Sequence, residues 1–153
     1  MQELSEAAKL LAHGIAFERQ ERNHSALDAY DRALALDPGF EPAAMRKAML
    51  LEDLERFDQA LAIYDALLAA NPGHSAAASN RAGLLLQLGQ VEAALASLDQ
   101  ALAADPENHL LALNKGLLLL QGLDRPADAR PWLERAHAAG LPEAAHALAL
   151  CTN

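Results

Sequence analysis

Apolar residues recur in steps of three and four along short segments, and these segments come in pairs. Between residues 75 and 108, the first segment ends in Leu84, Leu85 and Leu88. The second segment carries an apolar face formed by Ala94, Leu95, Leu98, Ala101 and Leu102. Such spacing is typical of amphipathic α-helices. Only Gly89 and Gln90 separate the two segments, so the pattern predicts two antiparallel helices joined by a short turn.

The same pair of segments is repeated with a period of 34 residues. Residues of one kind fall in the same place in each copy: Pro38, Pro72 and Pro106; Ala26, Ala60 and Ala94; Tyr30, Tyr64 and Leu98. A fixed period of this length indicates a stack of helical repeats. We place the repeats at about 7–40, 41–74, 75–108 and 109–142, within one domain that covers residues 1–153.

The fourth repeat departs from the period after its first helix. The turn from Gly122 to Pro126 holds one extra residue if the second helix is shifted by one position. The shift places Ala129, Leu133 and Ala136 in the expected columns, whereas the unshifted alignment places Asp128 at a small buried position. We prefer the insertion. The residues that follow predict a helix at 143–151 that caps the apolar flank of the last repeat.

Composition favours an all-α fold. The chain is 52% hydrophobic and 4% aromatic, so alanine and leucine must form most of the core. Alanine favours helices and close helix packing. β-branched apolar residues, which favour strands, are limited to Val91, Ile15 and Ile63.

Charge and cysteine content exclude several classes of function. The formal charge of −9 and pI near 5.0 disfavour binding to nucleic acid and to anionic membranes. The longest apolar run, near Leu117–Leu120, is too short for a membrane span, and the N-terminus lacks the pattern of a signal peptide. The single cysteine, Cys151, excludes an intrachain disulfide and a zinc–cysteine cluster, so we expect a cytoplasmic protein without cofactors.

Eight residues of each repeat match a known pattern: a large residue, a two-residue step ending in a small residue, a second large residue, then alanine, aromatic, alanine and proline. The first repeat supplies Leu10, His13-Gly14, Phe17, Ala26, Tyr30, Ala33 and Pro38. The next two supply Ala44, Lys47-Ala48, Leu51, Ala60, Tyr64, Leu67 and Pro72, then Ala78, Arg81-Ala82, Leu85, Ala94, Leu98, Ala101 and Pro106. This pattern resembles the tetratricopeptide repeat over residues 7–142.

The resemblance implies a right-handed superhelix of four helix-turn-helix repeats plus the capping helix. In similar proteins the first helices line a concave groove that holds a peptide from a partner protein, and the family implies interaction and not catalysis. The sequence departs from the family in having no tryptophan at the first large position. It also carries basic residues or histidine where the family has leucine.

The resemblance places the groove at the second, fifth, sixth and ninth positions of each first helix. The apolar candidates for this surface are Leu11, Ile15, Met45, Met49 and Leu117, and the polar candidates are Arg46, Asn80 and Asn114. Asparagine amides donate and accept, so they suit the main chain of an extended peptide. Burial against neighbouring helices, and hydrogen bonds within the scaffold, are the alternatives. Because Leu11 and Ile15 replace the lysine and asparagine of the carboxylate clamp, binding of a chaperone's C-terminal tail is not expected.

A basic column and an acidic column repeat in step with each other. His13, Lys47, Arg81 and Lys115 lie on first helices, while Asp31, Asp65, Asp99 and, after the shift, Glu134 lie on second helices. A stripe that attracts an acidic peptide is one interpretation. We favour ion pairs inside or between repeats, which would fix their register.

No phosphate-binding loop, zinc-protease helix or nucleophile elbow is present, and the histidines are scattered. We therefore expect no enzyme and no metal site. The sequence predicts a scaffold or adaptor that binds a partner peptide in its groove. A small acidic chaperone for a secreted or assembling substrate is the alternative, and self-association through apolar flanks is a further kind of partnership.

Overall fold

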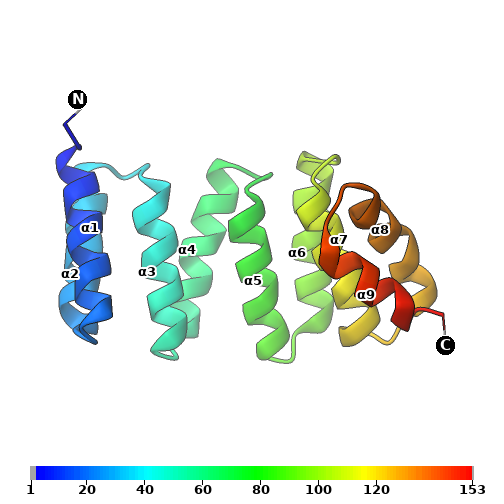
Figure 1. Cartoon of the computed structure of the whole chain (residues 1–153). Coiled ribbons are helices and arrows are strands. Elements are labelled where there is room, and N and C mark those ends of the chain that lie inside the picture. The colour runs from blue at the N-terminus through cyan, green and yellow to red at the C-terminus, as the bar shows by residue number, and fades with distance from the viewer. Residues whose placement is uncertain (1–2, 153) are drawn as a thin grey trace. The chain divides into compact units, whose positions relative to one another are not determined.

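The computed structural model describes residues 3–152, which form nine α-helices and no strand (Figure 1). The all-α prediction is confirmed. The chain divides into two compact units, residues 1–67 and 68–153, and the boundary falls within helix α4. The prediction of one domain over 1–153 stays a prediction.

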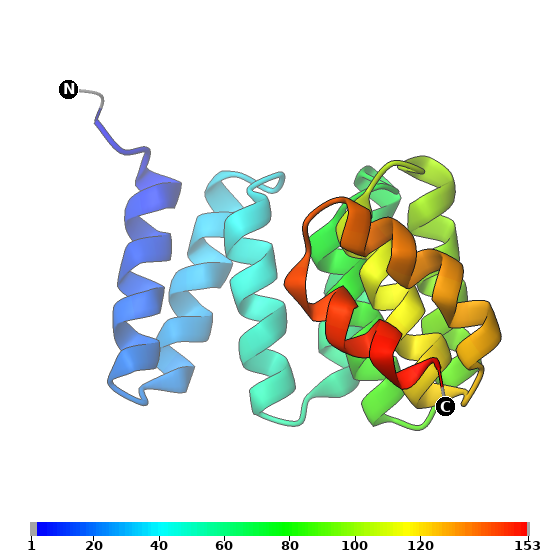
Figure 2. The same cartoon turned by 45° about the vertical axis from the view of Figure 1, so that its right-hand side comes forward.

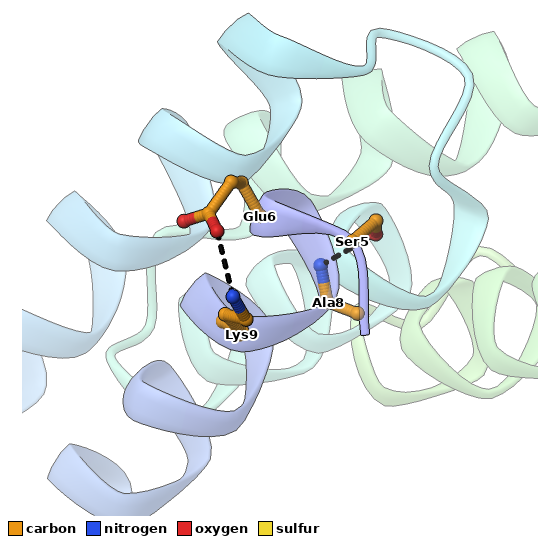
Figure 3. A network of polar contacts seen from close by, with 4 residues as sticks. All are labelled: Ser5, Glu6, Ala8 and Lys9. Carbon is orange, nitrogen blue, oxygen red and sulfur yellow. Dashed lines mark hydrogen bonds and ion pairs between the residues drawn. The ribbon is translucent and has the colours of Figure 1, made fainter. Parts of the chain in front are cut away.

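The first unit contains two antiparallel helix pairs. Its last helix, α4, extends beyond the boundary at Leu67. Its helices are α1 (Glu6–Arg19), α2 (Asn23–Leu36), α3 (Glu41–Asp53) and α4 (Phe57–Ala70). Ser5 caps the N-terminus of α1, and its hydroxyl accepts a hydrogen bond from the Ala8 amide at 3.1 Å (Figure 3). In the same turn Lys9 donates to Glu6 at 2.8 Å and lowers the pKa of that carboxyl. The Ser5 hydroxyl thus satisfies a free amide of the first turn, and the negative charge of Glu6 complements the positive end of the helix.

The second unit contains five more helices and a π-helical turn. These are α5 (Ser75–Gln87), α6 (Val91–Ala104), α7 (His109–Leu117), the π-helix η1 (Leu118–Gly122), α8 (Pro126–Ala138) and α9 (Pro142–Leu150). Helix α9 lies against α8 (Figure 2). Ala144 and Ala147 of α9 join Leu113 and Leu133 in one apolar cluster, and Trp132 packs against it. The segment expected at 143–151 is therefore a helix that covers the last pair.

The turns between paired helices share one backbone conformation. Glu21, Glu55 and Gly89 occupy the same position of successive repeats and all have positive φ, at 58°, 58° and 76°. The next amide then donates to the carbonyl five residues back, as in Arg56 to Leu51 at 2.8 Å and Gln90 to Leu85 at 2.8 Å. This bond satisfies a carbonyl that the helix end leaves free. Two of these three turns therefore use a glutamate where glycine is least strained.

The extra residue of the fourth repeat is confirmed, and it lies in the π-helix. Leu123 donates to the carbonyl of Leu118, and Arg125 donates to that of Leu119, six residues back, at 2.8 Å. The left-handed residue accordingly moves to Asp124, with φ of 51°. Beyond the insertion the register is restored, because Ala129, Leu133 and Ala136 are fully buried.

Within each pair, a small residue of the first helix faces a large one of the second. A Cβ added to Gly14 would collide with the ring of Tyr30, and one added to Gly116 would lie 2.6 Å from Leu133 Cδ2. Tyr30 and Leu133 are fully buried. The absence of a side chain at these two glycines thus sets how closely the helices approach.

The turn geometry predicts opposite effects of glycine at Glu55 and alanine at Gly89. Glu55→Gly should raise the free energy of unfolding by about 0.5–1 kcal/mol, because it relieves left-handed strain. Gly89→Ala should lower it by about 1 kcal/mol for the same reason. Urea unfolding gives both values. Glu92→Gly on α6, where the backbone is helical, is the control and should destabilise; a gain there, or a loss with Glu55→Gly, contradicts this account.

The close helix contact predicts that Gly14→Ala and Gly116→Ala each lower the free energy of unfolding by about 1–3 kcal/mol through overpacking. The matched control is Gly83→Ala, because a Cβ there meets no atom within 4 Å. Thermal and urea unfolding of the three variants measure the difference. Equal stability of all three would disprove the packing role of Gly14 and Gly116.

Candidate functional site

An apolar hollow of the second unit lies between the first helices of two successive pairs, α5 and α7. Its volume is about 150 Å³. Ser79, Gly83 and Leu86 line it from α5, and Asn114 and Leu117 line it from α7. Ala82, Leu98, Leu118 and Gln121 complete the lining. None of these nine side chains is ionisable, so the hollow is uncharged and largely apolar.

A hydrogen bond between the two helices fixes one polar edge of this hollow. The side-chain amide of Asn114 donates to the Ser79 hydroxyl at 2.6 Å, and both side chains are partly buried. The carbonyl oxygen of the Asn114 side chain keeps its acceptor capacity. Asn80 is also half-buried and lies within α5, and its side-chain amide makes no hydrogen bond to another residue of the described range 3–152. Of the two predicted asparagines, Asn114 thus serves the scaffold and borders the hollow, while the amide of Asn80 is available.

Leu117 contributes both to the core and to the hollow. It packs against the apolar cluster of α7, α8 and α9 and also lines the cavity. Leu113, four residues earlier on the same helix, is 4% exposed and belongs to the core. Leu113 is therefore a core residue, whereas Leu117 lies between the core and the hollow.

The remaining predicted groove residues lie in the first unit. Leu11 packs against the core formed by Ala7, Ala33 and Ala43, so it is partly buried. Ile15 and Met45 are half-buried, whereas Met49 is 43% exposed. The structure brings none of these five residues, Leu11, Ile15, Met45, Arg46 and Met49, into the hollow between α5 and α7.

Arg46 is engaged by a polar cluster of the first unit. Its guanidinium lies 3.8 Å from a carboxylate oxygen of Glu18, and Glu18 accepts a hydrogen bond from the Tyr30 hydroxyl. Burial raises the pKa of Tyr30, and the hydrogen bond and charge of Glu18 raise it further. Tyr64 and Glu52 form the same hydrogen bond in the next pair.

Sequence reasoning missed Leu86 and Gln121, which lie outside the groove positions that the resemblance indicates, and it did not select Gly83 as a candidate. Gly83 stands in the ninth column beside Ile15, Met49 and Leu117, but a missing side chain gives no apolar signal. Leu86 was recognisable from its spacing, because it lies three residues after Gly83 and seven after Ser79 on the same helix face; the structure shows that it is 41% exposed. A large exposed leucine on the face that carries Ser79 and Gly83 marks that surface.

The basic and acidic columns form ion pairs in both units. Lys47 lies 2.6 Å from Asp31 and Lys115 lies 2.5 Å from Asp99. Each pair joins the second helix of one repeat to the first helix of the next, so the preference for ion pairs is confirmed at these positions. Glu134 instead lies 3.8 Å from Arg130 on its own helix, and the Lys115 ammonium also lies 4.1 Å from the centre of the Trp132 ring.

A polar hollow of about 220 Å³ in the first unit differs in kind from the apolar one. His24, Asp28, Asp31, Lys47, Arg56 and Gln59 are among its lining residues. Over residues 3–152, no three histidine, cysteine or acidic side chains are grouped so that they could hold a metal ion. In the same part of the chain, no helix is both long enough and apolar enough to cross a membrane.

The ion pairs predict a small coupling energy. A double-mutant cycle of Lys115→Met and Asp99→Asn should give about 0.5–1 kcal/mol, because both side chains retain contact with water. The single and the double variant that carry Lys115→Met both lose the contact between Lys115 and Trp132, so this contribution cancels in the cycle. Unfolding in urea at low and high salt measures the coupling, which should fall as salt rises. A coupling of zero would contradict the structural role.

The sequence matches a family model described as tetratricopeptide repeat, at residues 11–75, 45–109 and 80–145. Comparison with curated proteins gave no significant match. Among solved structures, TTC0263, a thermophilic repeat protein of Thermus thermophilus, is 25% identical with a TM-score of 0.70. That match covers 95% of this chain and 80% of that one.

Two other solved structures are similar over 95% of this chain. A tetratricopeptide repeat protein of Parabacteroides merdae is 20% identical, with a TM-score of 0.77 and 58% of its own length covered. PilF of Pseudomonas aeruginosa is 22% identical, with a TM-score of 0.76 and 67% of its length covered. At these identities the likeness shows the fold.

Proposed function

We propose that this chain, which belongs to the tetratricopeptide repeat family, binds an extended segment of a partner protein on the surface between α5 and α7. The observation that carries the proposal is the uncharged hollow of about 150 Å³ between these first helices. Proteins of this family are in general scaffolds without catalysis, and the proposed role is that of a scaffold or adaptor. A cytoplasmic location, expected from the single cysteine, belongs to the same proposal.

The side chains around the hollow suit an extended segment more than a helix. An extended peptide carries main-chain N–H and C=O groups that need partners, whereas a helix satisfies its own. Asn80 and Asn114 stand on adjacent first helices and can donate to and accept from such groups. Leu86 and Leu117 line the hollow together with Asn114 and supply its apolar surface. The first-unit residues Leu11, Ile15, Met45, Arg46 and Met49 stay candidates for further contacts with the partner.

The proposal predicts that peptides selected on the protein from a random 12-residue display library bind through these amides. The double variant Asn80→Ala/Asn114→Ala should weaken their binding about tenfold or more, because main-chain groups then lose their partners. Fluorescence anisotropy with labelled synthetic peptides measures the dissociation constant. Gln100→Ala, which removes an exposed amide from α6, is the matched control and should leave affinity unchanged.

Two outcomes would change the proposal. Unchanged affinity in the Asn80→Ala/Asn114→Ala variant, with the fold intact by circular dichroism, would remove this surface as the site. Binding of unfolded polypeptides without sequence preference, and suppression of their aggregation, would favour the alternative role as a chaperone.

A further inference from the structure

Gly83 is a helix residue that the fold does not explain. It lies inside α5 with an ordinary helical backbone, it is exposed, and an added Cβ would meet no atom within 4 Å. Glycine is a poor helix former, since it loses the most backbone freedom and contributes no side chain. Alanine at this position would therefore stabilise α5 without a steric clash.

The other glycines inside α-helices differ in this respect. Gly14 and Gly116 are buried, and each gives way to a large side chain of the facing helix, Tyr30 or Leu133. Gly83 instead opens on the hollow between α5 and α7. The space that the missing side chain leaves lies at the surface and is not filled by a core residue. This points to a ligand as the reason for a glycine at this position.

The size and charge of the hollow define what fits. A cavity of about 150 Å³ lined by apolar groups holds a molecule of the size of benzene, and this hollow has that volume. Leu86, Leu117 and Leu118 form apolar walls. Because no lining side chain is ionisable, a charged group would be desolvated there without a partner, which is unfavourable.

We propose that Gly83 marks a subsite that receives one uncharged, bulky apolar side chain, of leucine to phenylalanine size, from the extended partner segment. This inference rests on the proposed function and adds the class of residue that the partner must present. Asn114 and Gln121 also line the hollow, and their amides can donate to and accept from main-chain groups of the bound segment. Ionic strength should have little influence, since the subsite contains no charge.

The test uses the full chain and peptides selected from the 12-residue display library. Selected peptides should share one leucine, methionine or phenylalanine, and its replacement by alanine should weaken binding about 10- to 100-fold. Gly83→Leu should fill the subsite and weaken binding at least tenfold. Ala96→Leu, which adds the same bulk to an exposed position of α6, should change affinity less than twofold.

Stability measurements separate the effect of a substitution at Gly83 on binding from its effect on folding. Gly83→Ala should raise the melting temperature by about 2–4 °C, because the helix gains a better helix former, while it weakens binding several-fold. Between 50 and 500 mM salt the dissociation constant should change less than threefold.

The outcomes separate the subsite from the proposed function. Peptides that bind wild type and Gly83→Leu equally, or that share a charged residue in place of an apolar one, would overturn the subsite and leave binding by Asn80 and Asn114 intact. A library that yields no binding peptide would overturn both.

Discussion

Close approach of the two helices in each pair is the constraint from which the rest of the structure follows. In the first pair it depends on Gly14 facing Tyr30, and in the fourth on Gly116 facing Leu133. Ala48 and Ala82, which occupy the same column between them, are buried and differ from glycine only by a methyl group. Small side chains thus replace bulky packing in a chain with only 4% aromatic residues.

The large residue of the second helix, which packs against the small residue of the first, also determines the chemistry of the neighbouring surface. Tyr30 and Tyr64 end in hydroxyl groups, and each donates to a glutamate of the facing helix, Glu18 or Glu52. In the third repeat leucines occupy both positions, Leu98 for the tyrosine and Leu86 for the glutamate. A buried hydroxyl requires a polar partner and a leucine does not. The surface of α5 therefore carries an apolar hollow where the first unit has a polar cluster.

Much of the fold could be predicted from the sequence, because its signals are periodic. The helices, the turns and the insertion in the fourth repeat follow from columns such as Pro38, Pro72 and Pro106. Ion pairing of Lys47 and Lys115 was also predictable, since opposite charges recur in step. The candidate site was harder to predict from the sequence. Periodicity does not separate Leu113, which is buried, from Leu117, which borders the hollow, and Gly83 contributes through the atoms it lacks.

The π-helix has a consequence for how such an array varies in length. An additional residue in an α-helix would turn every later side chain by about 100° and move an apolar face toward water. Here Leu118–Gly122 absorb that residue within a single wide turn, and Ala129 and Leu133 return to the core. A hairpin of this family can therefore gain one residue without a compensating deletion. The turn between α7 and α8 can therefore be lengthened at this point while the packing of the following helix is retained.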